Sequence, residues 1–372
     1  MRKSNVGAAL LCSLALIGAQ AAAQDTGPTG PVPYEILDDW PIAFQSAGFA
    51  YGGNSGVYAA TPDRIIVLQR GETLLPDPLP EGFTDFAGSI DINVLGGYGR
   101  TWQNVIYVVD RNGDVVEVWD QWDHLFEGTD GPGPHRIRVS PYDPEGRIWI
   151  IHETGEQIFV LSNDGERLLK TFGEKNVAGQ DQNHFGKPQD VAFLPDGRVL
   201  IADGYDNGRV MVLDSDWEYL GEFGDGRGEA LGQFNRVHGI AIGPDERVYI
   251  VDRDNRRVQI FEETGSGGAA FEAVDEWTDF GLPLDIIVGQ DRVWVTDLRP
   301  VKIVQLDFDG NRLYTFNLPT EGPGRYIEMH SFTVDAEGHL YGADNQHGRI
   351  QKFVPKPGVD RSQLVGRPFA RR

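Results

Sequence analysis

The stretch "VHGIAIGPDERVYIVDRDNRRVQIF" at residues 237–261 contains three short runs of apolar or alternating residues with turns between them. Short runs with period-two alternation, bounded by Gly, Pro, Asn and Asp, are typical of β-strands. The stretch therefore predicts three antiparallel strands. One residue is unexpected in such a pattern, because His238 stands just before the first strand, where a sheet gains nothing obvious from an imidazole.

The same three-strand pattern recurs along the chain. Its copies begin at Asn54, Pro134, Pro188, Val237, Pro283 and Met329. Most copies also hold a fourth strand, such as "RLLKTFG" at residues 167–173. Repeats of this length and strand content are typical of blades that pack side by side in a ring. The sequence therefore predicts an all-β fold, a six-bladed β-propeller.

The two ends of the repeat region predict how the ring closes. The last copy lacks its fourth strand, whereas a spare strand pattern, "YEILDDW", lies at residues 34–40. If this segment completes the last blade, no sheet edge is left open. We therefore predict a propeller over residues 34–355, with an insertion in the first blade at 71–103. An extended linker at 24–33 precedes it, and a basic tail at 356–372 follows.

The first 23 residues have the pattern of a secretory signal peptide. Arg2 and Lys3 form a basic start, residues 6–17 are apolar, and three alanines at 21–23 supply a small-residue cleavage site before Gln24. The apolar run is too short to span a membrane comfortably. We therefore expect residues 1–23 to be removed and the protein to be periplasmic or secreted.

Charge and cysteine content limit the partners and the chemistry. The formal net charge is −23 at pH 7, which argues against nucleic acid and anionic membranes as partners. Cys12 is the only cysteine and lies in the signal segment, so the mature chain has no disulfide, no thiolate nucleophile and no Cys metal ligand. Any metal must be bound by His, Asp or Glu. We expect a monomer.

The position before the innermost strand of each copy forms a ring around one mouth of the predicted channel. Its occupants, in chain order, are Ser55, His135, Gln189, His238, Leu284 and His330. Histidine on alternate blades places three imidazoles about a threefold axis, and three His nitrogens with an open fourth position are typical of catalytic zinc. None of the other five histidines of the chain falls on this ring. We predict a metal site there, with zinc favoured, although iron, copper and nickel also accept imidazole.

A second ring lies near the same mouth, at the residue that follows the second strand of each copy. Its occupants are Arg70, Glu153, Gly204, Arg253, Leu298 and Asn345, and Tyr205 follows Gly204. Two guanidinium groups, from Arg70 and Arg253, suit a substrate carboxylate because each planar fork can bind it bidentately. Each arginine taken alone would more ordinarily form a surface ion pair in such an acidic protein, and it is their coincidence with the histidine ring that favours substrate binding.

Two known families resemble these segments. Residues 223–261 are similar to the NHL repeat, with its G-Q-F, G-I-A and N-x-R-[IV] elements. Residues 181–210, with their D-G-Y-x-N motif, resemble the peptidyl-α-hydroxyglycine α-amidating lyases, also called peptidylamidoglycolate lyases, which are zinc-dependent six-bladed propellers. "IVLQRG" at 66–71 and "DRDNRRVQIF" at 252–261 resemble the segments that carry the two substrate-binding arginines of that family.

The resemblance to the lyases implies a role for each candidate residue. His135, His238 and His330 fall on the zinc ligands, and Tyr205 falls on the catalytic tyrosine. The two substrate-binding arginines become Arg70 and Arg253, so the implied catalytic set is Tyr205, Arg70 and Arg253.

The chain departs from the family pattern at several positions. An aspartate that helps to bind a structural Ca²⁺ in the family is Ser331 here, so the sequence does not support a calcium site. A methionine near the third ligand is replaced by Glu328, and Arg136 stands where glycine follows the first ligand. Both cysteine pairs of the family are replaced, by Gly186 with Asp206 and by Tyr249 with Ile260.

The preferred hypothesis is a secreted zinc lyase that cleaves the N–C bond of a carbinolamide, such as a C-terminal α-hydroxyglycine, to give an amide and glyoxylate. Its substrate would be a peptide or a small molecule that bears a carboxylate. One alternative is a non-catalytic NHL propeller that binds protein or glycan, but a binding scaffold needs no histidine on alternate blades. Another is a zinc-dependent lactone or ester hydrolase, because three-histidine zinc serves both chemistries.

Overall fold

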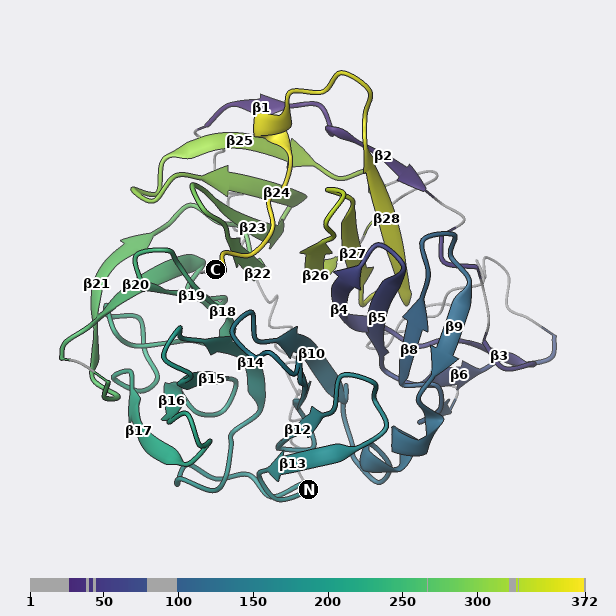
Figure 1. Cartoon of the computed structure of the whole chain (residues 1–372), viewed down its shortest axis with the longest axis horizontal. Coiled ribbons are helices and arrows are strands. Elements are labelled where there is room, and N and C mark those ends of the chain that lie inside the picture. Colours follow the sequence, from purple (N-terminus) through teal and green to yellow (C-terminus); the bar gives the residue numbers. More distant parts are fainter. Residues whose placement is uncertain are drawn as a thin grey trace, which may run out of the picture.

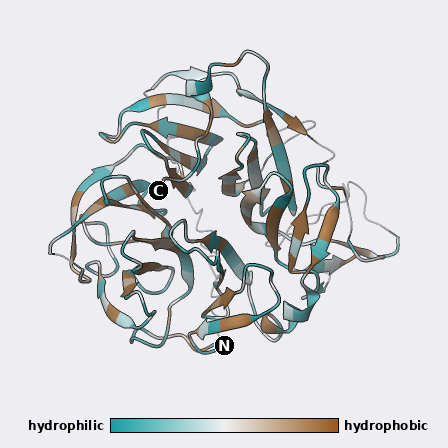
Figure 2. Ribbon diagram, in the orientation of Figure 1, coloured by the Kyte–Doolittle hydropathy of each residue, from teal (hydrophilic) through white to brown (hydrophobic). Residues whose placement is uncertain are grey.

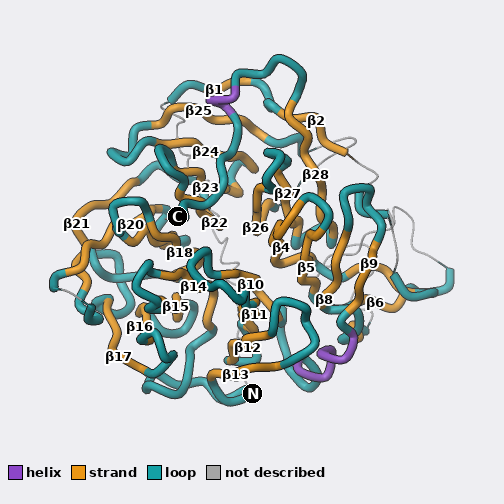
Figure 3. The backbone as a smooth tube through the Cα atoms, viewed as in Figure 1, coloured by secondary structure: helices purple, strands orange, loops and turns teal. Residues whose placement is uncertain are grey.

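Six antiparallel sheets are arranged around a central axis in the computed structural model of the chain (Figure 1). The structure describes residues 27–37, 40–42, 45–78, 99–265, 267–320, 326 and 328–370. Strands and loops make up almost all of the described chain, and the helical turns are two short 3-10 segments, η1 (Asp120–Leu125) and η2 (Arg361–Gln363) (Figure 3). The prediction of an all-β, six-bladed propeller is confirmed.

In five of the blades, the four strands follow chain order from the channel outward, with β6 and β7 intervening in blade one. Blade one is β4 (Asn54–Thr61), β5 (Arg64–Gln69), β8 (Ile106–Val109) and β9 (Val115–Val118). Blade two is β10 (Pro134–Val139), β11 (Ile148–His152), β12 (Gln157–Leu161) and β13 (Leu168–Phe172). Blade three is β14 (Pro188–Phe193), β15 (Val199–Asp203), β16 (Arg209–Leu213) and β17 (Tyr219–Phe223). Blade four is β18 (Val237–Ile242), β19 (Val248–Asp252), β20 (Arg257–Glu263) and β21 (Phe271–Trp277). Blade five is β22 (Pro283–Val288), β23 (Val293–Leu298), β24 (Val301–Leu306) and β25 (Arg312–Asn317).

The sixth blade joins the two ends of the chain. It consists of β26 (Met329–Val334), β27 (Leu340–Asp344), β28 (Arg349–Pro355) and the N-terminal β2 (Tyr34–Leu37). β2 pairs antiparallel with β28, with Tyr34 opposite Pro355 and Leu37 opposite Lys352. The predicted closure by an N-terminal strand is confirmed, and the pairing covers the edge that β28 would otherwise expose.

Two segments differ in detail from the sequence-based expectation. The expected linker contains β1 (Thr29–Gly30), which adds a fifth, parallel strand to blade five at β25. The expected insertion contributes β6 (Glu72–Leu74) and β7 (Arg100–Thr101), which form a small sheet with β3 (Phe49–Tyr51). These pairings were missed because such short strands carry no periodicity. Residues 79–98 of the insertion lie outside the described residues.

The hydrophobic core lies between neighbouring blades. Between blades two and three, for example, Trp149 and Ile151 pack in one cluster with Val191 and Ile201. Both faces of a blade are therefore buried, and this explains why many strands read as continuous apolar runs (Figure 2). Within the described part of the chain, we find no helix with the length and hydropathy that crossing a membrane would require.

The innermost strand of every blade has a register shift at the ring position. The shifts lie between Asn54 and Gly56, Pro134 and Arg136, Pro188 and Asp190, Val237 and Gly239, Pro283 and Asp285, and Met329 and Ser331. A bulge of this kind leaves one residue without a ladder partner and re-aims its side chain. The ring histidines are therefore the second residues of β10, β18 and β26 rather than residues that precede these strands.

The residues at the positions of the family's cysteine pairs are neighbours, one pair across a sheet and the other in adjoining loops. Tyr249 lies opposite Ile260 in the β19–β20 pair. The Asp206 N–H donates to the Gly186 carbonyl at 3.0 Å. Both members of each pair thus lie at positions that face each other, although this chain has no cysteine at any of the four.

Candidate metal centre

Three histidines from alternate blades meet in the channel. His135, His238 and His330 each offer a ring nitrogen, and these three nitrogens lie within 4.8 Å of one another. The ring centroids are 4.6 to 5.2 Å apart, and the rings stand nearly perpendicular to one another. All three side chains are buried. The structure thus brings together the three residues that the alternating pattern of the ring singled out.

The backbone of the intervening blades orients these imidazoles. Nδ1 of His135 donates to the Gln189 carbonyl at 2.7 Å, and Nδ1 of His238 donates to the Leu284 carbonyl at 2.6 Å. Nδ1 of His330 lies 2.8 Å from the Ser55 carbonyl. The three acceptors are the ring residues of the blades that lack a histidine. For His135 and His238, these bonds select the tautomer that leaves the Nε2 lone pair free for a metal.

The electrostatics of the three histidines also fit a metal ion. Burial, together with the neighbouring cationic side chains, lowers the pKa of each imidazole well below its ordinary value, so the rings are neutral at pH 7. Among the described residues, Nε2 of His135 and Nε2 of His238 are buried without a hydrogen-bond partner. Buried polar atoms without partners are costly, and a divalent cation would satisfy them. The donor set therefore fits zinc.

A buried arginine lies on the Nδ1 side of the histidines. Nη1 of Arg136 lies 2.5 Å from the His330 carbonyl and 2.9 Å from Nδ1 of the same residue. Its Nη2 donates to the Leu284 carbonyl at 2.9 Å. The Arg136 guanidinium therefore contacts the same backbone that orients the imidazoles, on the side away from the free Nε2 atoms.

Two buried aspartates balance this cation and join it to a second arginine. Asp190 and Asp285 lie 4.0 and 3.8 Å from the Arg136 guanidinium. Nε and Nη2 of Arg138 donate to the Asp190 carboxylate at 2.8 Å, and Nη2 also donates to the Asp285 carboxylate at 2.7 Å. We call these four residues, Arg136, Arg138, Asp190 and Asp285, the charged layer. With two cations and two anions it carries no net charge, so it adds little repulsion toward a bound metal.

Tyr205 and Arg253 lie together beside one of the histidines. The Tyr205 ring stacks on His238 with 5.9 Å between ring centroids. Nη1 of Arg253 donates to the Tyr205 hydroxyl at 2.6 Å, and Nε of Arg253 donates to Asp254 at 3.0 Å. Burial raises the pKa of the Tyr205 phenol, and this effect outweighs the opposing effect of the Arg253 charge. The hydroxyl therefore keeps its proton at neutral pH.

Arg70 enters the site from blade one together with a carboxylate that the sequence reasoning gave no role. Nε of Arg70 donates to the Pro134 carbonyl at 3.0 Å, and Nη2 lies 3.6 Å from Glu153. Oε2 of Glu153 is also 4.0 Å from Nε2 of His135. Glu153 is buried, and burial raises its pKa despite the nearby Arg70. A carboxylate thus stands next to the free nitrogens of the centre.

A second buried carboxylate, Glu328, belongs to the same group of charges. Its Oε2 accepts from Nε2 of Gln346 at 3.1 Å. Burial raises the pKa of Glu328, and this effect outweighs the opposing charges of Arg70 and Arg253. The expectation of two arginines facing a substrate carboxylate is therefore incomplete, because Glu153 and Glu328 share their surroundings and reduce the positive charge.

Two other histidines, His184 and His152, lie outside the metal centre, and within the described chain both ring nitrogens of His152 are buried without a hydrogen-bond partner. His184 is only half-buried, and its Nδ1 lies 2.8 Å from Asp181, which agrees with its interpretation as a loop anchor. His152 is buried at the end of β11 and packs edge-to-face on Phe126, 5.0 Å between centroids. Neither belongs to the cluster of three.

The charged residues to which the sequence analysis gave no role carried a visible signal. Asp190, Asp285 and Arg136 each follow a ring position directly, and Arg138 lies two residues further along its strand. Charged residues inside apolar strands such as "PQDVAF" and "PLDIIV" are rare unless paired. Their pairing could not be inferred because the partners are on different blades.

Comparison with known proteins gives a match to one repeat family and matches to individual proteins. The NHL repeat family matches residues 185–213 and 234–261. A probable peptidyl-α-hydroxyglycine α-amidating lyase of Caenorhabditis elegans is 29% identical over 223 residues, which are 59% of this chain and 55% of that protein. Peptidyl-glycine α-amidating monooxygenase B of Xenopus laevis is 26% identical over 344 residues, 87% of this chain and 36% of that protein. The chain thus spans about half of the first relative and about a third of the second.

A solved structure shares the fold. An auxiliary nutrient binding protein from Bacteroides thetaiotaomicron superimposes with a TM-score of 0.52 at 10% identity, covering 82% of this chain and 69% of that chain. At this identity the likeness concerns the fold alone. The sequence matches, in contrast, confirm the resemblance to the amidating lyases with NHL repeats.

Proposed function

We propose that this relative of the amidating lyases is a zinc-dependent lyase that cleaves the N–C bond of a carbinolamide, such as a C-terminal α-hydroxyglycine. The observation that carries the proposal is the group of three neutral imidazoles, two of which have buried Nε2 atoms without a hydrogen-bond partner in the described structure, next to the Tyr205–Arg253 pair. A propeller that only binds a partner has no use for this arrangement. Zinc held by His135, His238 and His330 would supply a Lewis acid that lowers the pKa of the substrate hydroxyl.

Arg70 and Arg253 bind the substrate carboxylate in this proposal. Each guanidinium is held by protein partners, Arg70 by the Pro134 carbonyl and Arg253 by Asp254. Fixed guanidinium groups lose little entropy when they bind a carboxylate, which favours recognition of the planar anion. The nearby Glu153 and Glu328 disfavour a second anionic group on the substrate.

Tyr205 moves the proton. Its hydroxyl is protonated at neutral pH and lies 2.6 Å from Nη1 of Arg253, so a carboxylate bound by that arginine brings the reacting carbon close to the phenol. The phenol gives its proton to the leaving nitrogen and takes the proton of the substrate hydroxyl. The electrons of that O–H bond form the C=O of glyoxylate, the C–N bond breaks, and the nitrogen leaves as an amide N–H₂.

We further propose that the enzyme works after export, as a monomer in the periplasm or outside the cell. The support is the basic, apolar and small-residue pattern of residues 1–23. The proposed substrate is a peptide or a small molecule that bears a carboxylate, and the acidic chain argues against nucleic acid and anionic membranes as partners.

The test is release of glyoxylate from an N-acyl-α-hydroxyglycine by purified protein loaded with zinc. Tyr205→Phe should keep the zinc and the melting temperature but lower turnover by about 10²–10⁴-fold. Arg253→Lys should act mainly through a higher KM, because a point charge replaces a planar fork. His184→Ala is the matched control and should retain full activity.

Two results would count against the lyase. Full turnover by Tyr205→Phe on this substrate would remove the proposed proton transfer. Absence of glyoxylate together with hydrolysis of a lactone or an aryl ester would make the zinc-dependent hydrolase the better account of the three histidines.

A further inference from the structure

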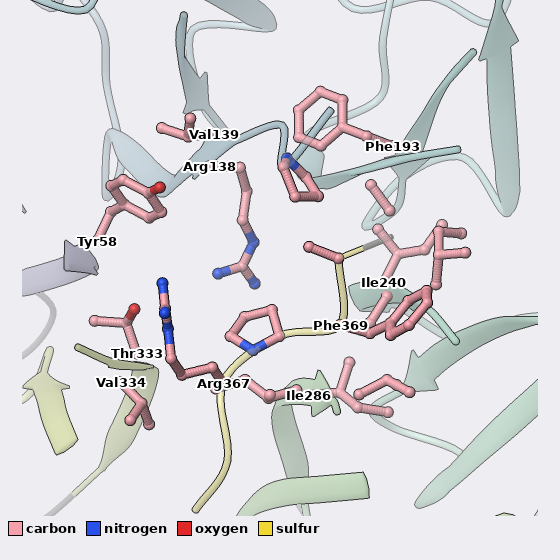
Figure 4. A pocket seen from close by; sticks show the side chains of 18 of the residues that line it. Tyr58, Arg138, Val139, Phe193, Ile240, Ile286, Thr333, Val334, Arg367 and Phe369 are labelled. Atoms are coloured by element: carbon pink, nitrogen blue, oxygen red, sulfur yellow. The ribbon is translucent and has the colours of Figure 1, made fainter. Parts of the chain in front are cut away.

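The channel contains a second chamber on the other side of the charged layer. It has a volume of 350 Å³ and is lined by the later residues of the innermost strands, among them Tyr58, Phe193, Ile240 and Ile286. We call it the far chamber. Its walls are largely apolar, and Figure 4 shows these side chains surrounding one space. A volume of this size is within the range of small-molecule sites.

The far chamber is separate from the metal centre. Arg136 contacts the Nδ1 side of the histidines, and Asp190 and Asp285 join Arg136 to Arg138. Arg138 in turn lines the chamber. The charged layer therefore lies between the two sites, and a molecule in the far chamber would not touch the three histidines.

Two cationic groups reach into this apolar space. The Asp190 and Asp285 carboxylates hold Nε and Nη2 of Arg138, while 19% of its side-chain surface remains accessible. Arg367 enters from the other side, so that the two guanidinium groups share the chamber (Figure 4). Among the residues that the structure describes, no carboxylate forms an ion pair with Arg367. Because Asp190 and Asp285 balance Arg136 and Arg138, Arg367 supplies the excess positive charge, and an anion is favoured beside it.

The C-terminal tail holds Arg367 at this place. The Val365 N–H donates to the Tyr34 hydroxyl at 2.7 Å, and the Phe369 N–H donates to the Val288 carbonyl at 2.7 Å. Gly366, between these anchors, lies against the Trp294 ring, where a side chain at this position would collide. The tail therefore crosses the mouth of the channel along a defined path and forms one wall of the chamber.

We propose that the far chamber is a second binding site, for a small carboxylate with an apolar body such as a medium-chain fatty acid anion. The carboxylate lies between Arg138 and Arg367, where charge-assisted hydrogen bonds hold it. The alkyl chain packs against Ile240, Ile286 and Phe369, which removes its apolar surface from water. Three related molecules should therefore bind poorly. An alcohol of the same length lacks the negative charge, an amine carries a positive charge, and acetate lacks the apolar chain.

Isothermal titration calorimetry with octanoate tests the site on the full-length protein. We expect binding of one octanoate with a Kd below about 1 mM. Octylamine and acetate should not bind at this concentration, and octanol should bind at least tenfold more weakly. Arg367→Glu should weaken octanoate binding at least tenfold, because the exposed side chain then repels the carboxylate. Arg361→Glu is the matched control, because Arg361 is also exposed on the tail but does not line the chamber.

A second variant tests the chamber itself. Ala241→Trp fills the space and should abolish octanoate binding, while an unchanged melting temperature shows that the variant folds. Zinc content and glyoxylate release should be the same in wild type and Arg367→Glu, so a failed lyase assay leaves this proposal intact. The proposal is overturned if octanoate does not bind wild type, if octylamine binds equally well, or if neither substitution weakens octanoate binding.

Discussion

The orientation of the metal-centre histidines depends on main-chain atoms of other blades. His238 takes its position from the bulge in β18 and its tautomer from the Leu284 carbonyl in β22. A main-chain acceptor stays in place when side chains change, so the ring geometry depends on how the blades are packed. Arg136 reinforces the same arrangement through the Leu284 and His330 carbonyls. We therefore expect substitutions of a ligand to remove metal without unfolding the blade.

His238→Ala should lose most of the bound zinc, because two imidazoles without the third make a weak site. His184→Ala should keep its zinc, since His184 bonds to Asp181 in a connecting loop. Metal analysis of both purified variants after zinc loading and dialysis measures the effect. Equal zinc loss in the two variants would show that the three-histidine centre is not the metal site.

His152 should make stability depend on pH. Burial lowers the pKa of this imidazole from 6.5 to about 3. Between these two values the unfolded chain binds a proton at His152 that the folded chain does not, so the free energy of unfolding falls as pH decreases from 6.5 toward 3. His152→Leu should reduce this dependence. Urea unfolding of wild type and variant between pH 7 and pH 4 measures it.

The exposed His124 provides the control for this comparison. His124→Gln should leave the pH dependence of the unfolding free energy as it is in wild type. If His152→Leu loses stability with acid as steeply as wild type does, the buried imidazole is not a source of the effect.

At the scale of elements, closure of the ring depends on one short strand. β2 has four residues, yet it pairs with Lys352 to Pro355 of β28 and buries Tyr34 against Phe316 and Phe353. β1 differs, because it only adds two residues to the edge of a blade that already has four strands. The two N-terminal strands therefore contribute unequally to the fold.

Deletion of residues 34–37 should lower the melting temperature and cause aggregation, because β28 then exposes an unpaired edge and the last blade loses Tyr34. Deletion of residues 27–30, which removes β1, should have the smaller effect. Thermal melts and size-exclusion chromatography compare the two. A monomer with an unchanged melting temperature after loss of residues 34–37 would contradict closure by β2.

At the scale of the whole molecule, the channel holds two chambers of opposite character. One contains the free imidazole nitrogens with Tyr205, Arg70 and Arg253, and the other is apolar and bordered by the tail. In the charged layer between them, two arginines of blade two are balanced by Asp190 of blade three and Asp285 of blade five. Both sites therefore require the complete ring, and we expect that no isolated blade reproduces either one.

The exported protein should begin near Gln24 and contain no thiol, because Cys12 lies in the segment that the signal pattern predicts to be removed. Intact-mass measurement of protein recovered from the periplasm or the medium tests this, and a thiol assay gives an independent check. A mature form that retains Cys12 would contradict the proposed export.

The repeated strand pattern by itself determined the number of blades, their strand content and the closing strand at Tyr34–Leu37. It also determined which histidines share a ring, because equivalent positions in a closed repeat lie at the same height along the axis. These features are local or periodic, so they can be read from residue spacing. The short strands β1, β3, β6 and β7 have no such period and were not predicted.

Only the tertiary structure decided which groups meet across the channel. The bulge at each ring position turns His135 and Arg136, which are neighbours in sequence, toward partners on three other blades. The placement of Arg367 in the same chamber as Arg138 likewise depends on how the chain closes around the axis. Such contacts join residues far apart in sequence, and their distances are set by the packing of six sheets, which no local pattern encodes.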